Sequence, residues 1–225
     1  MSRIAIIAAL PREVASLVAG KHWRREAGTS PDVFVWTHEK AVVALAGMGE
    51  PRASLAVNAA LATGPVEELV SVGWVGACAP GMPVGTIARP STVISASTGE
   101  RFTCREGDGS VLATVTTFAG TEEKRRLHAT YGASTVEMEA AAVARLALAH
   151  RLSFRAIKAV SDASNFEIPG IERFYTSEGQ FREAAFGAYV ALRPKLWRPV
   201  VTMAKGSKFA AEQLCRELEL LALSY

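Results

Sequence analysis

Ile4-Ala-Ile-Ile-Ala-Ala-Leu10 is a short, continuous apolar run near the start of the chain. A run without polar alternation is typical of a strand buried on both faces, as in a sheet that helices cover on each side. Pro11 follows directly and suits the first turn of a helix, which we expect to extend to about Gly20. Arg12 and Glu13 therefore lie at a strand-to-helix junction, beyond the carboxyl end of a central strand.

The rest of the chain alternates apolar strands with helical segments. We expect a hairpin at 33–37 and 41–46, strands at 68–73, 111–116 and 154–160, and helices at 51–62, 121–130, 177–192 and 207–223. We expect a polar loop at 96–110, an exit from the sheet at 73–76, and breaks at Pro194 and Pro199. This alternation predicts an α/β fold, a three-layer sandwich with a central mixed, mostly parallel sheet flanked by helices. An apolar stripe on the last helix is expected to pack on the core: Ala210, Leu214, Leu218 and Leu221.

Length and composition limit the classes of protein that fit. With 225 residues, of which 49% are hydrophobic, the chain suits a single domain spanning residues 1–225. The sequence has no run of about 18 apolar residues, and residues 4–10 are too short for a signal peptide. We therefore expect a cytoplasmic protein with no membrane partner. The net charge is +3 and the basic residues are spread out, which argues against nucleic acid as a partner.

Cysteine and histidine give no indication of a metal site. The three cysteines are an odd number without metal-like spacing, and the four histidines are scattered. The glycine turns lack the G-x-G-x-x-G spacing of dinucleotide-binding folds. We therefore expect neither a metal nor a cofactor, and an oxidoreductase that uses a dinucleotide is disfavoured.

Acids and glycines follow several of the predicted strands. Glu13, Asp162 and the glycine turns at 47–49 and 73–76 come where strands end. Ligands of mostly parallel sheets bind beyond the carboxyl ends of the strands, and glycines there let a ligand approach the backbone. These residues are therefore expected to line one crevice.

The segment Ser134-Thr-Val-Glu-Met-Glu-Ala140 places two carboxylates at the head of an alanine-rich stretch, which we expect to be one helix over 134–150. Acids in the first turn complement the helix dipole, so a cap at Ser134 or Thr135 explains Glu137 and Glu139 without any function. A second interpretation is that the two glutamates hold a diol while Met138 packs on a sugar or base. Both interpretations stay open at this point.

Taken together, the motifs resemble the purine nucleoside phosphorylase and methylthioadenosine/S-adenosylhomocysteine nucleosidase superfamily over roughly residues 3 to 165. Each motif alone is weak, but their order and spacing are specific. Residues 6–14 match the opening strand with its glutamate, and residues 46–49 match the glycine turn. Residues 72–76 take the place of the Gly-Ser-x-Gly turn. Residues 136–140 match the ribose-binding motif, and residues 159–162 match the base-binding motif.

The resemblance implies a role for each matching residue. Glu139 would accept hydrogen bonds from the ribose hydroxyls, and Met138 would pack under the sugar. Asp162, with a pKa raised by burial, would give a proton to purine N7. Ser161 would orient Asp162, and Phe118 would stack on the base. The remaining residues that the resemblance assigns to substrate binding are Glu137, Gly49, Gly73 and Trp74.

The attacking group separates the two branches of the superfamily. Glu13 matches the nucleosidase residue that deprotonates water. Arg12 lies near the sequence position at which phosphorylases carry an arginine that holds phosphate. Ser71 replaces a phosphorylase arginine, and Trp74 stands where the family usually has a serine. Hydrolysis is therefore favoured, with phosphate-binding by Arg12 and phosphorolysis as the alternative.

The sequence thus predicts an enzyme that cleaves the N-glycosidic bond of a purine nucleoside with water and releases the free base. The resemblance implies that the substrate is a 5′-modified adenosine such as methylthioadenosine. Phosphorolysis and a non-catalytic nucleoside-binding protein remain alternatives. Relatives usually assemble, so we expect a homodimer.

Overall fold

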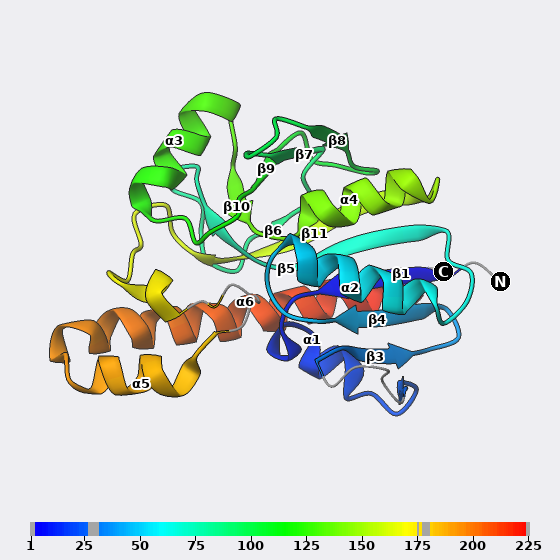
Figure 1. Cartoon of the computed structure of the whole chain (residues 1–225), viewed down its shortest axis with the longest axis horizontal. Helices are drawn as coiled ribbons and strands as arrows, with labels where there is room; N and C mark the ends of the chain where they lie inside the picture. The colour runs from blue at the N-terminus through cyan, green and yellow to red at the C-terminus, as the bar shows by residue number, and fades with distance from the viewer. Residues whose placement is uncertain (1–2, 27–31, 175, 177–180, 224–225) are drawn as a thin grey trace.

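Eleven strands form one sheet in the part of the chain that the computed structural model describes, residues 3–26, 32–174, 176 and 181–223 (Figure 1). Nine of them follow the order β2-β3-β4-β1-β5-β10-β9-β7-β8, and β11 pairs with β5 and with β6. The strands are β1 (Ile4–Ala8), β2 (Arg24–Arg25), β3 (Phe34–Thr37), β4 (Ala41–Leu45), β5 (Glu68–Ala77), β6 (Ile87–Ala88), β7 (Thr92–Ser95), β8 (Arg101–Thr103), β9 (Val111–Thr114), β10 (Thr135–Glu137) and β11 (Ser153–Asp162).

Helices cover both faces of the sheet. One buried apolar cluster joins α2 and α4 to the sheet, and a second joins α1 and α6 to its other face. Figure 1 shows α5 and the start of α6 extending beyond the sheet. The helices are α1 (Pro11–Val18), α2 (Glu50–Leu61), α3 (Thr121–Tyr131), α4 (Ala140–Ala149), α5 (Glu183–Ala191) and α6 (Trp197–Leu223), with short 3₁₀ turns at Ile171–Phe174 and Pro194–Leu196.

The apolar run at the start of the chain is a central strand, as predicted. β1 lies between β4 and β5, is parallel to both, and every one of its residues is buried. The longest ladder, between β5 and β11, is also parallel. The predicted three-layer α/β sandwich with a mixed sheet is therefore confirmed. Antiparallel pairing occurs in the hairpins and also between β5 and β10 and between β6 and β11.

Two expectations about the sheet are wrong. Residues 73–76 do not leave the sheet, because β5 continues to Ala77 while β11 pairs with it as far as Gly76. The segment at 96–110 is not only a loop, because Arg101–Thr103 forms β8 against β7. In both places the segment is a strand because it pairs with a neighbouring strand, and this pairing cannot be predicted from the local sequence.

The expected single helix over 134–150 is also divided. Thr135–Glu137 forms β10, paired with β9 on one side and with β5 on the other, and α4 begins only at Ala140. Ser134 and Thr135 therefore do not cap the helix. Glu139 occupies the N-cap position and Glu137 precedes it as the last residue of a strand.

The C-terminal helix is longer than expected. Pro199 does not break it, because it lies in the first turn of α6, where the missing N–H is not needed for a helical hydrogen bond. The predicted apolar stripe packs on the sheet, with Ala210, Leu214 and Leu218 fully buried. The helix expected at 177–192 is present as α5, but residues 177–180 lie outside the described part of the chain.

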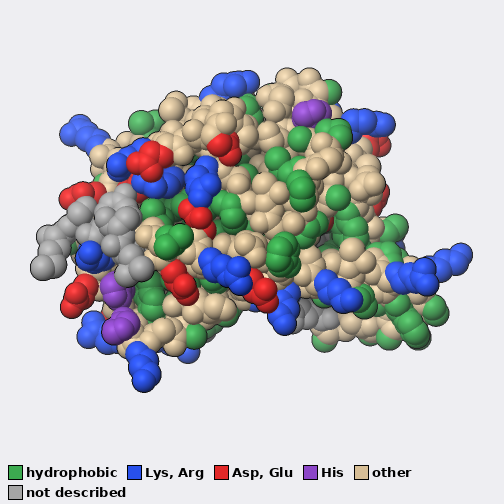
Figure 2. Space-filling view, turned by 180° about the vertical axis from the view of Figure 1, so that it is seen from behind, with side chains coloured by type: hydrophobic (Ala, Val, Ile, Leu, Met, Phe, Trp, Pro, Cys, Tyr) green, Lys and Arg blue, Asp and Glu red, His purple; other side chains and the backbone are tan. Residues whose placement is uncertain are grey.

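Surface properties agree with the small net charge. Lys and Arg side chains are spread over the face in Figure 2 and are not gathered into one stripe. Within the described ranges, none of the helices combines the length and hydropathy needed to cross a membrane.

Leu214→Ala in α6 should lower the free energy of unfolding by about 2–5 kcal/mol, because a fully buried leucine leaves a cavity between the helix and the sheet. Urea unfolding would measure the change. Leu220→Ala is the matched control on the same helix, since Leu220 is 66% exposed, and it should change the free energy by no more than about 0.5 kcal/mol. Equal losses for both variants would contradict the observed packing of α6.

Candidate active site

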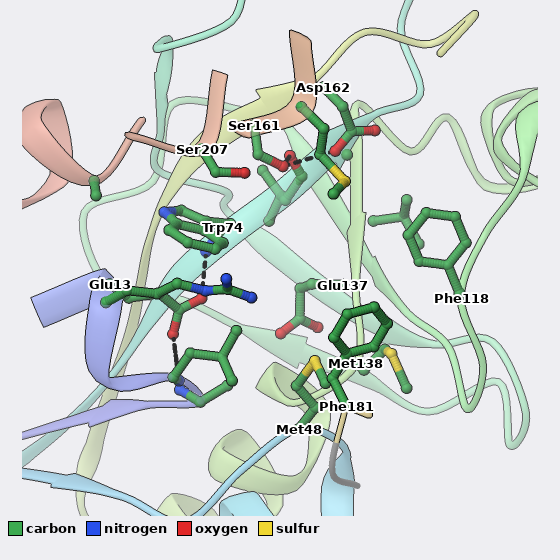
Figure 3. Close-up of a pocket in the computed structure, with 18 of the residues that line it drawn as sticks. Glu13, Met48, Trp74, Phe118, Glu137, Met138, Ser161, Asp162, Phe181 and Ser207 are labelled. Atoms are coloured by element: carbon green, nitrogen blue, oxygen red, sulfur yellow. Dashed lines mark hydrogen bonds between the residues drawn. The ribbon is translucent and has the colours of Figure 1, made fainter. Parts of the chain in front are cut away.

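A cavity of about 500 Å³ opens where β1, β5, β10 and β11 end, and Figure 3 shows the side chains that enter it. Most of the residues singled out from the sequence meet there: Arg12, Glu13, Trp74, Phe118, Glu137, Met138, Glu139, Ser161 and Asp162. Gly49 and Gly73 do not line the cavity itself. Each of them instead lies against a glutamate that does.

Glu13 is held by three backbone N–H groups. Its Oε2 accepts hydrogen bonds from the N–H groups of Ala9 (3.0 Å) and Leu10 (2.8 Å), and its Oε1 accepts one from Trp74 (3.0 Å). Burial raises the pKa of this carboxyl group, although the backbone donors and Lys158 oppose the rise. Each carboxylate oxygen has two lone pairs, so Oε1 keeps one acceptor position for a further donor.

Gly73 is required by the position of Glu13. A Cβ atom at residue 73 would lie 2.9 Å from Glu13 Oε1, and the backbone there has φ +133°, which side chains other than hydrogen rarely allow. The glycine therefore admits the carboxylate rather than a ligand, which differs from the expectation for this turn.

Glu139 reaches from the start of α4 to the turn before α2. Its Oε1 accepts a hydrogen bond from the N–H of Gly49 (2.7 Å), and its Oε2 accepts one from the N–H of Met138 (3.2 Å). Burial, followed by the charge of Glu137, raises the pKa of Glu139 to about 8. The carboxyl group of Glu139 therefore keeps its proton to a higher pH than an exposed glutamate does.

Glu137 is bound mainly by the chain itself. Its Oε2 accepts hydrogen bonds from the N–H groups of Glu139 (3.0 Å) and Ala140 (2.9 Å) and from Lys158 Nζ (3.1 Å), and its Oε1 accepts one from Thr114 (2.7 Å). These four donors cap α4 and join it to the sheet. Glu137 therefore has a structural role at the start of α4, although from a strand and not from the helical first turn that we expected, whereas Glu139 has fewer donors.

Sequence reasoning missed Lys158, which is 1% exposed. Its ammonium group donates to Glu137, to Ser71 Oγ (2.9 Å) and to the Val72 carbonyl (3.1 Å), so its three protons have three acceptors. The available signal was one lysine inside the apolar strand that ends at Asp162. A charge there is expensive to bury unless partners surround it.

Asp162 lies at the end of β11 with both oxygens engaged. Ser161 Oγ lies 2.7 Å from Oδ1, and the Lys124 ammonium of α3 forms an ion pair with Oδ2. The side chain is sheltered, with 15% of its surface exposed, as the sequence led us to expect. Lys124 was not anticipated, because it belongs to a run of charged residues that reads as an exposed helix.

Trp74 and Arg12 cover one wall of the cavity. The Arg12 guanidinium carbon lies 5.1 Å from the centre of the Trp74 ring, a cation–π distance. The indole stands beside Glu13, whose carboxylate receives the backbone N–H of the same residue (Figure 3). Among the described residues, the buried Trp74 Nε1 has no hydrogen-bond partner.

Apolar side chains form the remaining walls. Met48, Met138, Phe118 and Phe181 surround the carboxylates in Figure 3, and α6 adds Val200 and Met203. The described residues contain no group of three His, Cys, Asp or Glu side chains that could hold a metal ion. The cavity is therefore largely apolar, and backbone N–H groups hold the carboxylates in its wall.

Comparisons with known proteins agree with this fold. A family model described as the phosphorylase superfamily matches residues 3–108 and 100–185. No curated protein sequence matches the chain. The chain belongs to the phosphorylase superfamily, and this confirms the predicted class of enzyme, a nucleosidase or nucleoside phosphorylase.

Solved structures show the same fold at low sequence identity. The 5′-methylthioadenosine/S-adenosylhomocysteine nucleosidase of Neisseria meningitidis, in complex with methylthio-immucillin-A, is 16% identical with a TM-score of 0.73, and 97% of each chain is covered. The corresponding Helicobacter pylori nucleosidase is 12% identical with a TM-score of 0.72, covering 100% of this chain and 99% of that one. The futalosine hydrolase of Helicobacter pylori is 13% identical with a TM-score of 0.73, covering 100% and 98%.

The stability of the protein should fall as the pH rises from about 4.5 to about 8. The folded state keeps a proton on Glu139 up to about pH 8, whereas the unfolded chain loses it near the ordinary value of 4.5. The folded state then binds more protons in this window, so raising the pH lowers the free energy of unfolding. Glu139→Gln should make the dependence shallower, and urea unfolding at several pH values would measure it.

Met138→Leu is the matched control for this measurement. It changes a neighbouring cavity residue without removing a titratable group, so the pH dependence of the free energy of unfolding should stay as in the wild type. Glu13, whose pKa is also raised, should retain part of the slope in Glu139→Gln. An unchanged slope in Glu139→Gln would contradict the buried, protonated state of Glu139.

Proposed function

We propose that the protein hydrolyses the N-glycosidic bond of a purine nucleoside and releases the free base. The observation that carries this proposal is the convergence of Glu13, Glu139 and Asp162 on one sheltered cavity. Glycosidic cleavage needs an acceptor for the sugar hydroxyls, a proton for the departing base and a nucleophile on the opposite face of the sugar. The three carboxyl groups match these three tasks.

Glu139 is the proposed ribose ligand. It has one backbone donor on each oxygen, which leaves acceptor positions for the 2′- and 3′-hydroxyls of the sugar. Met138, next to it in the chain, would pack against the ribose ring. Gly49 would hold the carboxylate in place through its N–H, and Glu137 would fix the start of α4 behind it.

Asp162 is the proposed acid that protonates purine N7, with Ser161 fixing its orientation. Protonation turns the departing base into a neutral leaving group, and a positioned acid typically contributes about 10²- to 10⁴-fold to the rate. Phe118 lines the same cavity and would stack on the base.

Glu13 is the proposed base that activates water. Backbone donors hold it rigidly, and the remaining acceptor position of Oε1 is available for a water molecule. A pKa raised by burial suits a group that must accept a proton during turnover. In Figure 3 Glu13 and Asp162 lie on different sides of the cavity, as attack and departure on opposite faces require.

Water is favoured over phosphate as the nucleophile because of Trp74. Its indole lies beside Glu13 and stacks with Arg12, the residue that could otherwise grip an anion. Ser71 is buried and bonded to Lys158, so this position does not present a cation to the cavity. The location of Arg12 on the cavity wall is the observation that keeps phosphorolysis as the alternative.

A 5′-modified adenosine such as methylthioadenosine is the proposed substrate. Phe181, Val200 and Met203 give the cavity an apolar side that would suit an uncharged 5′-substituent. Two of the similar structures are 5′-methylthioadenosine/S-adenosylhomocysteine nucleosidases and a third is a futalosine hydrolase, so both kinds of nucleoside belong in the test. The single domain over 1–225, the homodimer and the cytoplasmic location stay predictions.

Free adenine should be released from methylthioadenosine in phosphate-free buffer, and adding phosphate should not raise the rate. The reason is that the Trp74 residue bonded to Glu13 stacks with Arg12, the guanidinium that would otherwise bind phosphate. Chromatography of the base and the sugar product would measure both conditions, with adenosine and futalosine as further substrates. Release only in the presence of phosphate would establish phosphorolysis, and tight binding without release would favour the binding-only alternative.

Glu13→Gln should lower kcat by at least about a hundredfold, because the amide cannot accept the proton of the attacking water. The amide nitrogen would also face backbone N–H groups, so some stability should be lost, and turnover must be measured below the unfolding transition. Ser16→Ala is the control, since Ser16 lines the same cavity one turn further along α1. Unchanged turnover in Glu13→Gln would remove Glu13 from the reaction.

A further inference from the structure

Lys124 is a buried cation on the cavity wall beside Asp162, where the purine of the proposed substrate would lie. Its side chain is 2% exposed, whereas Arg125 and Arg126 on the same helix are 79% and 51% exposed. Burying an ammonium group costs several kcal/mol unless partners compensate, and an aliphatic residue would fill the space at lower cost. The position is therefore unexplained by packing alone.

The ammonium group of Lys124 binds Asp162 and two backbone carbonyls that follow it in the chain. The ammonium pairs with Asp162 Oδ2 and donates to the carbonyls of Ala163 (3.0 Å) and Phe166 (3.4 Å). These three acceptors match the three protons of the ammonium group. The neighbouring Cys78 adds no charge near pH 7, because burial raises the pKa of its thiol to about 12.

The backbone of β5 makes room for this pair. A Cβ atom at Gly76 would lie 2.9 Å from Lys124 Cε and 3.0 Å from Asp162 Oδ2, closer than side chains normally approach. Lys124 and Asp162 also both line the cavity. The pair is thus built into the wall where the base of a nucleoside would lie.

We propose that Lys124 is a positioning residue that supplies Asp162 with the proton delivered to the departing base, an inference that rests on the proposed function. Asp162 pairs through Oδ2 with the Lys124 ammonium, and its Oδ1 lies 2.7 Å from Ser161 Oγ, whose single hydroxyl proton has the Val75 carbonyl (3.2 Å) as a second acceptor. A serine hydroxyl is a far weaker acid than an ammonium group, so Lys124 is the neighbour of Asp162 that can supply a proton.

The proton inventory of the reaction balances with this assignment. The C1′–N9 bond breaks and its electron pair goes to the base, while N7 takes a proton from Asp162 and Asp162 takes one from Lys124. Water forms the new bond to C1′ and gives a proton to Glu13. Afterwards Glu13 loses a proton to solvent and Lys124 regains one, so that the nucleoside and one water become the free base and the free sugar.

The test compares two substrates that differ in their need for a proton. Methylthioadenosine requires protonation of its base, whereas 4-nitrophenyl β-D-riboside releases a nitrophenolate that is stable as an anion. Lys124→Met should lower kcat for methylthioadenosine by at least about a hundredfold and leave nitrophenol release within about threefold. Nitrophenol release also reports that the variant is folded.

Lys124→Arg separates proton supply from charge. The guanidinium group keeps the positive charge but does not release its proton in proteins, so the same selective loss on methylthioadenosine is expected. Arg125→Met, which removes an exposed charge from the same helix, is the control and should alter neither activity. If Lys124→Met does not fold, the Lys124→Arg variant alone decides between the outcomes.

Each other outcome overturns the proposal. Restored methylthioadenosine cleavage in Lys124→Arg would show that charge alone suffices. Equal losses of kcat on both substrates would show that Lys124 only maintains the structure of the site. An unchanged kcat on both substrates would show that Lys124 has no part in the reaction. Absence of release by the wild-type protein from either substrate would overturn the proposed function itself, which is distinct from a failure confined to the variants.

Discussion

The site depends on keeping carboxylates in a cavity that is mostly apolar. Glu13, Glu137 and Glu139 are held there by backbone N–H groups, and Lys158 is the cation placed among them. Desolvation would otherwise push such groups to their neutral form, and Glu139 is already raised to a pKa of about 8. The fold meets this requirement by directing strand ends and helix starts, which carry spare N–H groups, at the same point.

This constraint explains several local features together. Glycine at 73 and 76 leaves space for Glu13 and for the Lys124–Asp162 pair, so these glycines serve the acids rather than a ligand. The strand β10 places Glu137 beside the start of α4, where its Oε2 accepts hydrogen bonds from the N–H groups of the N-cap residue Glu139 and of Ala140. Among the described residues, both buried lysines pair with carboxylates, so neither of them is available to an incoming phosphate.

Much of this arrangement could be predicted from sequence, for physical reasons. The apolar run at residues 4–10 fitted a strand covered on both faces, and acids after the ends of parallel strands were expected to meet at one edge of the sheet. The stripe on α6 was also predictable, because its spacing matches the helical period. The pattern of motifs then matched the superfamily that the family model confirms.

The rest depends on contacts between distant segments. Lys124 looks like its exposed neighbours in the sequence, and only the approach of α3 to β11 buries it. The division of 134–150 into β10 and α4 follows from pairing with β5 and β9, which local propensity does not reveal. The meaning of Trp74 depends on where the Arg12 guanidinium lies, and sequence alone does not give that distance.

The central claim is that Glu13 and Asp162 act on opposite faces of the sugar. The most direct test is proton NMR of the first sugar product from methylthioadenosine, recorded before the anomers equilibrate and with phosphate present. The account predicts the α-anomer of the free sugar, because water guided by Glu13 attacks opposite the departing base. A sugar 1-phosphate, or the β-anomer appearing first, would contradict it.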